Sequence, residues 1–590
     1  MTNGKWPSAV LAALALVGAA CSSGKGNGNG NGGSQGGSGG ASGVGGSSTT
    51  GGGGTTTGSG GSSGGGGGGI AGVGGVAGGA AGGTGGAGSG GTSGAGGLTG
   101  AGGLTGAGNS CMNGAPTGTA PNTLAVNVDT AATTINKEIF GVLMERLGRD
   151  ITGGLYVGTS STIPNTNGMR NDIIQGLKDA GVGMIEWPGG CAANNYNFSP
   201  PNPTNDMGTD RYMQLCSMLG IDPYIAGGGT AALAARNLQW ITYINNNTTH
   251  PEWNLKYFKV GNEVWGCGGN QTEATYETNY SANFNMLSAP INGKQTSLIA
   301  STGLIGNTTW LTTQLMNQAS MIDGIEVHDY IYHPNDIPST GFTDAQYYGV
   351  VNAANRGQIG PRLTQYIGIL DQFDPQKRIK IWEDEWGDWL EPVNAATDGF
   401  FQQMTLMDAI STAEQLHLFM QHADRVFMGG MAQAVNVIHS LFFTRAADAA
   451  LVKTPAFYVF KMFLPHHSSG AEWAPSTLTG ENITGNGATF PVLSAGATVD
   501  TLGHVNISLA NVDLVNTHAI QINLTSAKAG YTVSSAQVIT GPAKDSFNDF
   551  NVTETVNIQT LGASSCTISG KSLRVTLPSK SVVMLVLTPQ

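Results

Sequence analysis

The chain has 590 residues, and more than half of its 93 glycines lie before Cys111, so only part of it can fold around a hydrophobic core. Acidic residues outnumber basic ones by 38 to 26, which gives a formal net charge of -12. No cluster of Lys and Arg stands out against this acidic balance, which argues against nucleic acid and anionic membrane surfaces as partners.

Residues 1–21 are predicted to form a lipoprotein-type signal peptide. Lys5 gives a weakly positive start, and an apolar run at 9–17 follows it. This run is too short to span a bilayer and is typical of a cleaved export signal. Small residues stand directly before Cys21, as in a bacterial lipobox that lipidates the cysteine, although Gly18 occupies the position that is usually Leu. We expect an exported protein with a lipid anchor at the outer membrane or cell surface; ordinary secretion is the alternative.

Residues 22–118 are predicted to be a disordered linker. The part from 22 to 110 consists almost wholly of Gly, Ser, Thr, Ala and Asn and contains no aromatic residue. Such a segment buries too little apolar surface to offset the entropy of ordering its backbone. Behind a lipid anchor, this tether would hold a folded domain away from a membrane surface.

Residues 119–450 are predicted to form an α/β barrel with eight parallel strands, the (β/α)8 or TIM barrel. Short apolar runs that end in polar residues alternate with segments long enough for a helix, as expected for parallel strands with crossover helices. One such helix is predicted within 400–426, where apolar residues recur at near-helical spacing. The predicted strands lie at 139–144, 184–187, 223–226, 257–261, 298–301, 324–327, 379–382 and 426–432.

Residues 451–590 are predicted to form an antiparallel β-sandwich. After about Lys453 the apolar residues recur with period two, as in Val505, Ile507 and Leu509, with turn residues between the runs. The segment 119–136 precedes the first barrel strand and also alternates, so it is predicted to pair with the sandwich.

The six cysteines have no Cys-x-x-Cys spacing. Their pattern therefore indicates neither a zinc site nor a disulfide framework, and no metal is expected. If Cys21 is lipidated, five cysteines remain and at least one of them is unpaired.

Two glutamates follow predicted strands in unusual surroundings. Glu263 lies in KYFKVGNEVWG at 256–266, where Asn262 can hold a sugar hydroxyl while the carboxyl group protonates a leaving oxygen. Glu385 lies in IWEDEWG at 381–387, where tryptophans can wall a pocket. These glutamates follow the fourth and seventh predicted strands, and catalytic groups of such barrels lie where strands end. Two carboxyl groups about 5 Å apart there would perform retaining glycoside hydrolysis, with no metal or organic cofactor.

Five motifs follow one another between residues 136 and 465. They are GVLMERLGR at 141–149, WPGGC at 187–191, the run 256–269 with GNE at 261–263, DEWG at 384–387, and KTP at 453–455. In this order they resemble the α-L-arabinofuranosidases of glycoside hydrolase family 51. The resemblance implies that Glu263 is the acid/base and Glu385 the nucleophile.

The resemblance also implies residues that lie at the sugar. Tyr330 would lie against the nucleophile, and Gln433 would end the eighth strand. For Glu145, Tyr330 and Gln433 a plain core or strand-end role is the alternative. The complete set of implied substrate-binding residues is Glu145, Cys191, Asn262, Tyr330 and Gln433.

Two residues near these motifs leave open questions. His328 fits a buried histidine with a backbone partner as well as it fits a catalytic residue. The family usually has Arg before the Trp-Pro-Gly-Gly run, but this chain has Glu186. An arginine would keep the nucleophile ionised and oriented, whereas a glutamate raises the pKa of nearby carboxylates. We therefore expect either that another cation compensates or that the optimum pH and the sugar preference have shifted.

The carboxylate pair predicts a retaining glycoside hydrolase, and the resemblance implies an exo-acting α-L-arabinofuranosidase that removes arabinofuranosyl side chains from hemicellulose or arabinan. Its partner would be a plant cell-wall polysaccharide or an arabino-oligosaccharide. Two alternatives stay open. One is an endo-β-glucanase or xylanase that uses the same barrel and carboxylates, and the other is a surface lipoprotein that binds carbohydrate without turnover.

Overall fold

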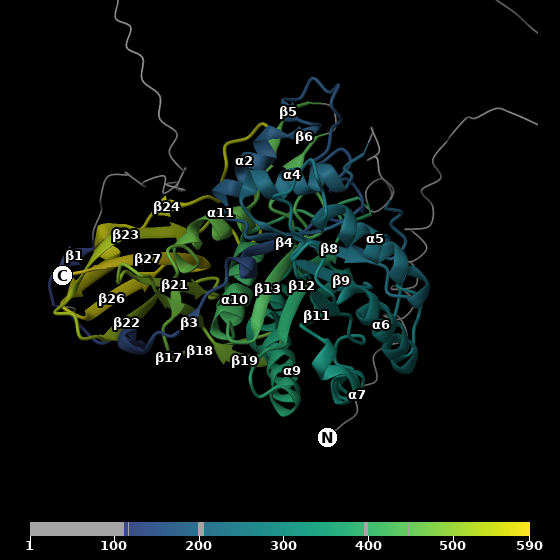
Figure 1. Ribbon diagram of the computed structural model, residues 1–590. Coiled ribbons are helices and arrows are strands. Elements are labelled where there is room, and N and C mark those ends of the chain that lie inside the picture. The colour runs from purple at the N-terminus through teal and green to yellow at the C-terminus, as the bar shows by residue number, and fades with distance from the viewer. Residues whose placement is uncertain (1–110, 116, 199–205, 395–398, 446–447) are drawn as a thin grey trace, which may run out of the picture. The chain divides into compact units, whose positions relative to one another are not determined.

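A closed barrel of eight parallel strands carries the predicted motifs (Figure 1). This computed structural model describes residues 111–590 except 116, 199–205, 395–398 and 446–447. The predicted signal peptide and most of the predicted linker lie outside the described residues. The barrel strands are β4 (Gly141–Leu143), β7 (Met184–Trp187), β8 (Asp222–Gly227), β9 (Tyr257–Val260), β10 (Ser297–Ala300), β11 (Gly324–Pro338), β12 (Lys380–Glu391) and β13 (Val426–Ala432).

The predicted TIM barrel is confirmed. Each strand pairs in parallel with the next along the chain, and β13 closes the barrel by pairing with β4. No helix of the described residues is long and apolar enough to cross a membrane. The larger helices between the strands are α2 (Asn171–Asp179), α4 (Thr209–Leu219), α5 (Ala234–Asn245), α6 (Glu273–Leu287), α7 (Thr308–Gln318), α8 (Asp344–Asn352), α9 (Ile359–Phe373) and α10 (Leu406–Gln421).

The barrel interior is built in layers of different chemistry. An apolar layer comes first along the strands, and its members are Met184, Tyr224, Ile299, Trp382 and Met428. Residues two positions apart in a strand face the same side, so the next layer is formed by the residues that follow at that spacing. This second layer is polar and buried, and it contains Glu186, Lys259, Ser301, Glu326 and Asp384.

Two further sheets form the predicted C-terminal sandwich, which is also confirmed. The first has the order β1 (Met112–Asn113), β25 (Cys566–Ser569), β26 (Ser572–Leu577), β22 (His518–Thr525), β2 (Asn122–Asn127) and β17 (Ser476–Thr479). The second has the order β24 (Gln559–Thr560), β23 (Tyr531–Ile539), β27 (Ser581–Pro589), β21 (Val505–Asn511), β20 (Leu493–Val499), β16 (Glu472–Trp473) and β3 (Thr133–Thr134).

The pairing in the sandwich is antiparallel with two exceptions. β1 runs parallel to β25, and β2 runs parallel to β22. Both exceptions involve strands that precede the barrel in the chain, so no hairpin dictates their direction. The chain therefore contributes strands to the sandwich both before and after the barrel.

Helix α10 is buried between the barrel and the sandwich. It contacts β12 of the barrel and β20, β21 and β27 of the sandwich. Among its buried polar residues, His417 lies 3.0 Å and 2.8 Å from the hydroxyls of Ser494 and Ser508. The helix predicted within 400–426 therefore exists, but at Leu406–Gln421 it is shorter than the apolar pattern. The barrel covers one of its faces and the sandwich the other.

The cysteine spacing indicated no disulfide framework, but the structure contains two disulfide bonds. Cys111 is bonded to Cys566, and Cys191 is bonded to Cys267. The partners are 455 and 76 residues apart in the sequence, so local spacing carries no signal of either bond. Cys216 is buried and is the free cysteine among the described residues.

Candidate active site

The carboxyl ends of the barrel strands surround a cavity that includes every residue predicted as catalytic or sugar-binding. Loops after the strands meet at this end of a TIM barrel, which is why catalytic groups lie there. The cavity is lined by Glu145, Leu147, Gly190, Cys191, Asn262, Glu263, Tyr330, Glu385, Trp389, Gln433 and Ile438. The seven predicted residues are far apart in the sequence, so only the fold brings them together.

Glu263 and Glu385 lie close to each other in this cavity. One carboxylate oxygen of Glu263 and one of Glu385 are within 4.8 Å of each other. Glu263 follows β9 with a left-handed backbone, φ 44°, and Glu385 is part of β12. A retaining mechanism needs carboxyl groups roughly 5 Å apart, whereas an inverting mechanism needs about 6.5–9.5 Å to admit a water molecule. The geometry therefore fits retention of configuration.

His328, on β11, lies between the two glutamates. Its Nδ1 is 3.2 Å from Oε1 of Glu263 and 3.4 Å from Oε2 of Glu385. Burial opposes protonation, but Glu385 and Glu326 overcome this effect and raise the pKa of His328 well above its ordinary value. Its partners are therefore carboxylates of the site rather than the backbone, and their charges favour the protonated imidazole.

The charge state of Glu385 depends on several neighbours. Burial raises the pKa of Glu385 to about 8, His328 opposes this rise, and Glu263 adds to it. The Tyr330 hydroxyl donates a hydrogen bond of 3.0 Å to Oε2 of Glu385, which favours the ionised form. Glu385 is thus placed among groups that decide its ionisation.

Glu145 is held by two hydrogen bonds on the other side of the cavity. Its Oε2 accepts from Nε2 of Gln433 at 2.7 Å, and its Oε1 accepts from the backbone N–H of Cys191 at 3.2 Å. A Cβ atom at Gly190 would lie 1.8 Å from Oε1 of Glu145, and the φ of Gly190 is 51°. Glycine is required here because the backbone approaches the carboxylate too closely for any side chain.

A buried lysine, Lys259, lies beside Glu186. Nζ of Lys259 lies 2.9 Å from Glu186 and 3.0 Å from Asp384. Burial raises the pKa of Glu186 well above its ordinary value, and Lys259 acts against this rise. The structure therefore contains a cation beside Glu186. Sequence reasoning missed Lys259, although its position four residues before Glu263 on a predicted strand was a usable signal.

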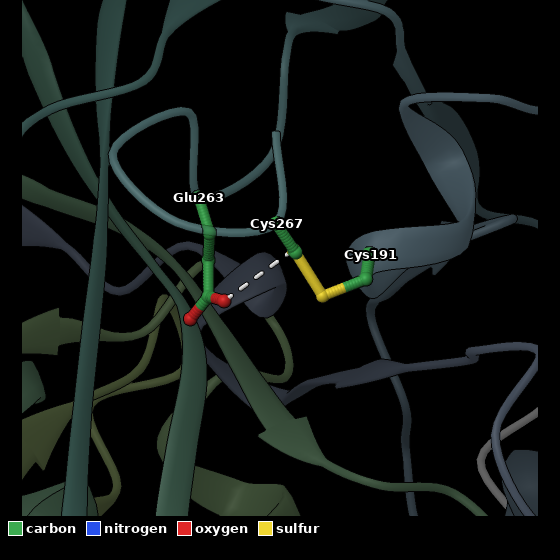
Figure 2. Close-up of side chains that lie close together, drawn as sticks. All are labelled: Cys191, Glu263 and Cys267. Carbon is green, nitrogen blue, oxygen red and sulfur yellow. Dashed lines mark hydrogen bonds between the residues drawn. A yellow bond between two sulfur atoms is a disulfide. The ribbon is translucent and has the colours of Figure 1, made fainter. Parts of the chain in front are cut away.

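A disulfide bond lies against the acid/base candidate (Figure 2). It joins Cys191, in the short helix α3 (Gly190–Ala193) after β7, to Cys267, in the loop after β9. Sγ of Cys267 is 3.6 Å from Oε2 of Glu263. Because a disulfide sulfur carries no hydrogen, this is a packing contact. The disulfide links Cys191, which lines the cavity, to the loop that carries Glu263.

A second cavity adjoins the first and shares Glu263, Tyr330 and Trp389 with it. Its volume is about 220 Å³. Aromatic and apolar side chains form much of its wall, which is typical of sites that bind the face of a sugar ring or an aryl group. Its remaining residues are Trp265, Leu304, Ile305, His328, Tyr332, His333, Gln358 and Arg362.

Comparison with known proteins agrees with this geometry. The family described as Alpha-L-arabinofuranosidase C-terminal domain matches residues 384–581. An intracellular exo-alpha-L-arabinofuranosidase of Bacteroides ovatus is 32% identical over 499 residues, which cover 78% of this chain and 95% of that protein. Alpha-L-arabinofuranosidase C of Emericella nidulans is 26% identical over 66% of this chain and 84% of that protein.

A solved structure has the same architecture. The GH51 arabinofuranosidase from Xanthomonas axonopodis pv. citri superimposes with a TM-score of 0.73 and 27% sequence identity. The superposition covers 80% of this chain and 100% of that one. The uncovered part of this chain amounts to about the length of the segment that precedes the described residues.

Proposed function

Because this chain belongs to the α-L-arabinofuranosidases of glycoside hydrolase family 51, we propose that it is an exo-acting, retaining α-L-arabinofuranosidase with Glu385 as nucleophile and Glu263 as acid/base. The observation that carries these roles is the pair of carboxylate oxygens within 4.8 Å of each other at the carboxyl end of the barrel. The relatives reported above are arabinofuranosidases, which supports this activity over the endo-acting and non-catalytic alternatives.

The reaction proceeds in two displacements. Glu385 attacks the anomeric carbon while Glu263 gives its proton to the departing glycosidic oxygen, and a covalent glycosyl-enzyme ester forms. Glu263 then removes a proton from water, whose oxygen attacks the anomeric carbon and releases Glu385. Two inversions at one carbon leave the configuration unchanged.

The first step needs a charged Glu385 and a proton on Glu263. The Tyr330 hydroxyl donates to Glu385 and His328 lies against it, and both contacts favour the negative charge on Glu385. Once Glu385 is esterified its charge is gone. Glu263, which gave up its proton in the first step, then acts as the base for water.

The substrate is divided between the two cavities. The first cavity holds the arabinofuranosyl unit, with Glu145, Asn262 and Gln433 as hydrogen-bonding partners of its hydroxyls. The second cavity, beyond Glu263, receives the leaving group, which is the remainder of a hemicellulose or arabinan chain or of an arabino-oligosaccharide. Side chains of plant cell-wall polysaccharide are therefore the substrates that we propose.

We further propose that the protein is exported and anchored by lipid at Cys21, with secretion as the alternative. The first 21 residues support this, and so do the two disulfides, because such bonds form mainly in oxidising compartments. Metabolic labelling with a fatty acid tests the proposal. Label that is lost in Cys21→Ala supports the anchor, and an unlabelled protein in the cytoplasmic fraction contradicts export.

An assay on three aryl glycosides tests the enzymatic proposal. The chain from just before Cys111 onward is compared with Glu263→Ala and Glu385→Ala on α-L-arabinofuranoside, β-xyloside and β-glucoside. We expect turnover of the arabinofuranoside, with kcat/KM lower by roughly 100- to 10,000-fold in Glu263→Ala. Azide should restore product of inverted configuration only in Glu385→Ala. A folded parent chain that turns over none of the three would contradict the proposal.

A further inference from the structure

The ammonium group of Lys259 has a partner that is not a carboxylate. Its Nζ donates a hydrogen bond of 2.8 Å to Oδ1 of Asn262. Both side chains are fully buried, and Asn262 lines the catalytic cavity. This hydrogen bond therefore connects the polar layer inside the barrel to the site of the sugar.

The hydrogen bond decides which end of the Asn262 amide faces the cavity. An ammonium group can only donate, so the amide must present its oxygen to Lys259. Nδ2 of Asn262 is then left on the other side, where it is buried and has no hydrogen-bond partner among the described residues. A buried donor without a partner is costly, and a ligand in the cavity that Asn262 lines would supply the missing acceptor.

The orientation is held from several directions. The Asn262 backbone N–H donates to Oδ1 of Asn194 at 3.0 Å, and its carbonyl accepts from Nδ2 of Asn194 at 2.9 Å. Lys259 itself is fixed by ion pairs with three carboxylates, those of Glu186, Asp384 and Glu326. Turning the amide would bring its NH2 group against the ammonium, which sets two donors together and breaks a charge-assisted hydrogen bond.

We propose that Lys259 is a positioning residue that locks Asn262 with its N–H groups toward the sugar, so that the site selects a hydroxyl that accepts a hydrogen bond there. This role rests on the proposed function, because the ligand is the arabinofuranosyl unit. A hydroxyl that accepts from Asn262 keeps its own hydrogen for a carboxylate of the site. A sugar that lacks this hydroxyl leaves Nδ2 unpaired and is rejected.

A double-mutant cycle tests the lock. Lys259→Met, Asn262→Ala and the double variant are compared by kcat/KM on an aryl α-L-arabinofuranoside, each at the plateau of its own pH profile. If Lys259 acts through Asn262, each single change lowers kcat/KM by about 10- to 100-fold, and the double variant falls no more than about 3-fold below Asn262→Ala. Losses that multiply would overturn the proposal, because independent effects are additive in free energy.

A second variant tests the same idea if Lys259→Met does not fold. Asn262→Asp keeps an acceptor for Lys259 but presents an acceptor in place of a donor to the sugar. We expect its kcat/KM to fall as far as that of Asn262→Ala, and retained activity would overturn the proposal. Lys380→Met is the matched control, because Lys380 is a β12 lysine whose partner is the backbone of Asp424. It should keep the kcat/KM of the parent.

The design separates this inference from the function on which it rests. A parent chain without turnover of the arabinofuranoside refutes the proposed function and this role together. A parent chain with turnover, but with multiplying losses in the cycle, refutes the role of Lys259 alone.

Discussion

The hydroxyl group of Tyr330 is expected to set how easily the nucleophile ionises. It donates to Oε2 of Glu385, and this bond is stronger when Glu385 is charged, so it lowers the pKa of that carboxyl group. Tyr330→Phe removes the bond. The pKa of Glu385 then rises, the acidic limb of the kcat/KM profile moves to higher pH, and the plateau falls roughly 10- to 100-fold. A pH profile that superimposes on that of the parent would show that Tyr330 only fills space.

Residues that carry chemistry were easier to predict than the partners that tune them. Glu263, Glu385 and Asn262 lie in short motifs at the ends of predicted strands, where sequence alone indicates a polar group at the mouth of the barrel. Lys259 lies close to Glu263 in the sequence, but its ion-pair partners come from the distant strands β7, β11 and β12. The carboxylates that face Lys259 are set by how neighbouring strands align in the closed barrel. This alignment cannot be read from the sequence.

Strand β12 and helix α10 meet at a pair of buried carboxyl groups, Asp388 and Asp408. Burial, with the charge of Asp408 second, raises the pKa of Asp388 well above its ordinary value. Burial also raises the pKa of Asp408 to about 6. Both carboxyl groups have ordinary pKa values in the unfolded chain. The folded state therefore keeps a proton that the unfolded state releases, and stability is lost as the pH rises.

Asp388→Asn tests this pair by removing the titrating proton while keeping a donor of similar shape. Above the ordinary pKa of an aspartate, we expect the free energy of unfolding of the parent to fall more steeply with rising pH than that of the variant, by up to about 1.4 kcal/mol per pH unit for the one proton. Urea unfolding at several pH values measures the two slopes. Parallel slopes would mean that Asp388 is already ionised in the folded protein.

At the level of elements, burial explains what could be predicted. The eight barrel strands are largely buried, so each contains a short apolar run, and all eight were found from the sequence. β11 and β12 continue to Pro338 and Glu391, beyond their predicted ends at 327 and 382. The added parts contain polar residues that line the site, so the apolar pattern used for the prediction stops before them. The full length of these two strands could therefore not be predicted from the apolar pattern.

On the scale of the molecule, the Cys111–Cys566 disulfide ties the start of the described chain to the sandwich. It closes a loop that contains the whole barrel, so its loss should stabilise the unfolded chain through greater conformational entropy. We expect the double variant Cys111→Ser/Cys566→Ser to lose about 2–4 kcal/mol of unfolding free energy while its kcat/KM stays that of the parent. Thermal unfolding and the aryl glycoside assay measure the two effects, and a loss of kcat/KM in folded protein would contradict their separation.

The Cys191–Cys267 disulfide makes the active site sensitive to reducing agents. Cys191 lines the cavity that holds Glu263 and Glu385, and Cys267 packs against Glu263, so dithiothreitol in a purification buffer would convert this disulfide into two thiols. The Cys267 thiol would then have a hydrogen to offer to the acid/base carboxylate. Activities measured with and without reductant therefore describe two chemically different sites. Kinetic constants of this enzyme should be given together with the redox state of the sample.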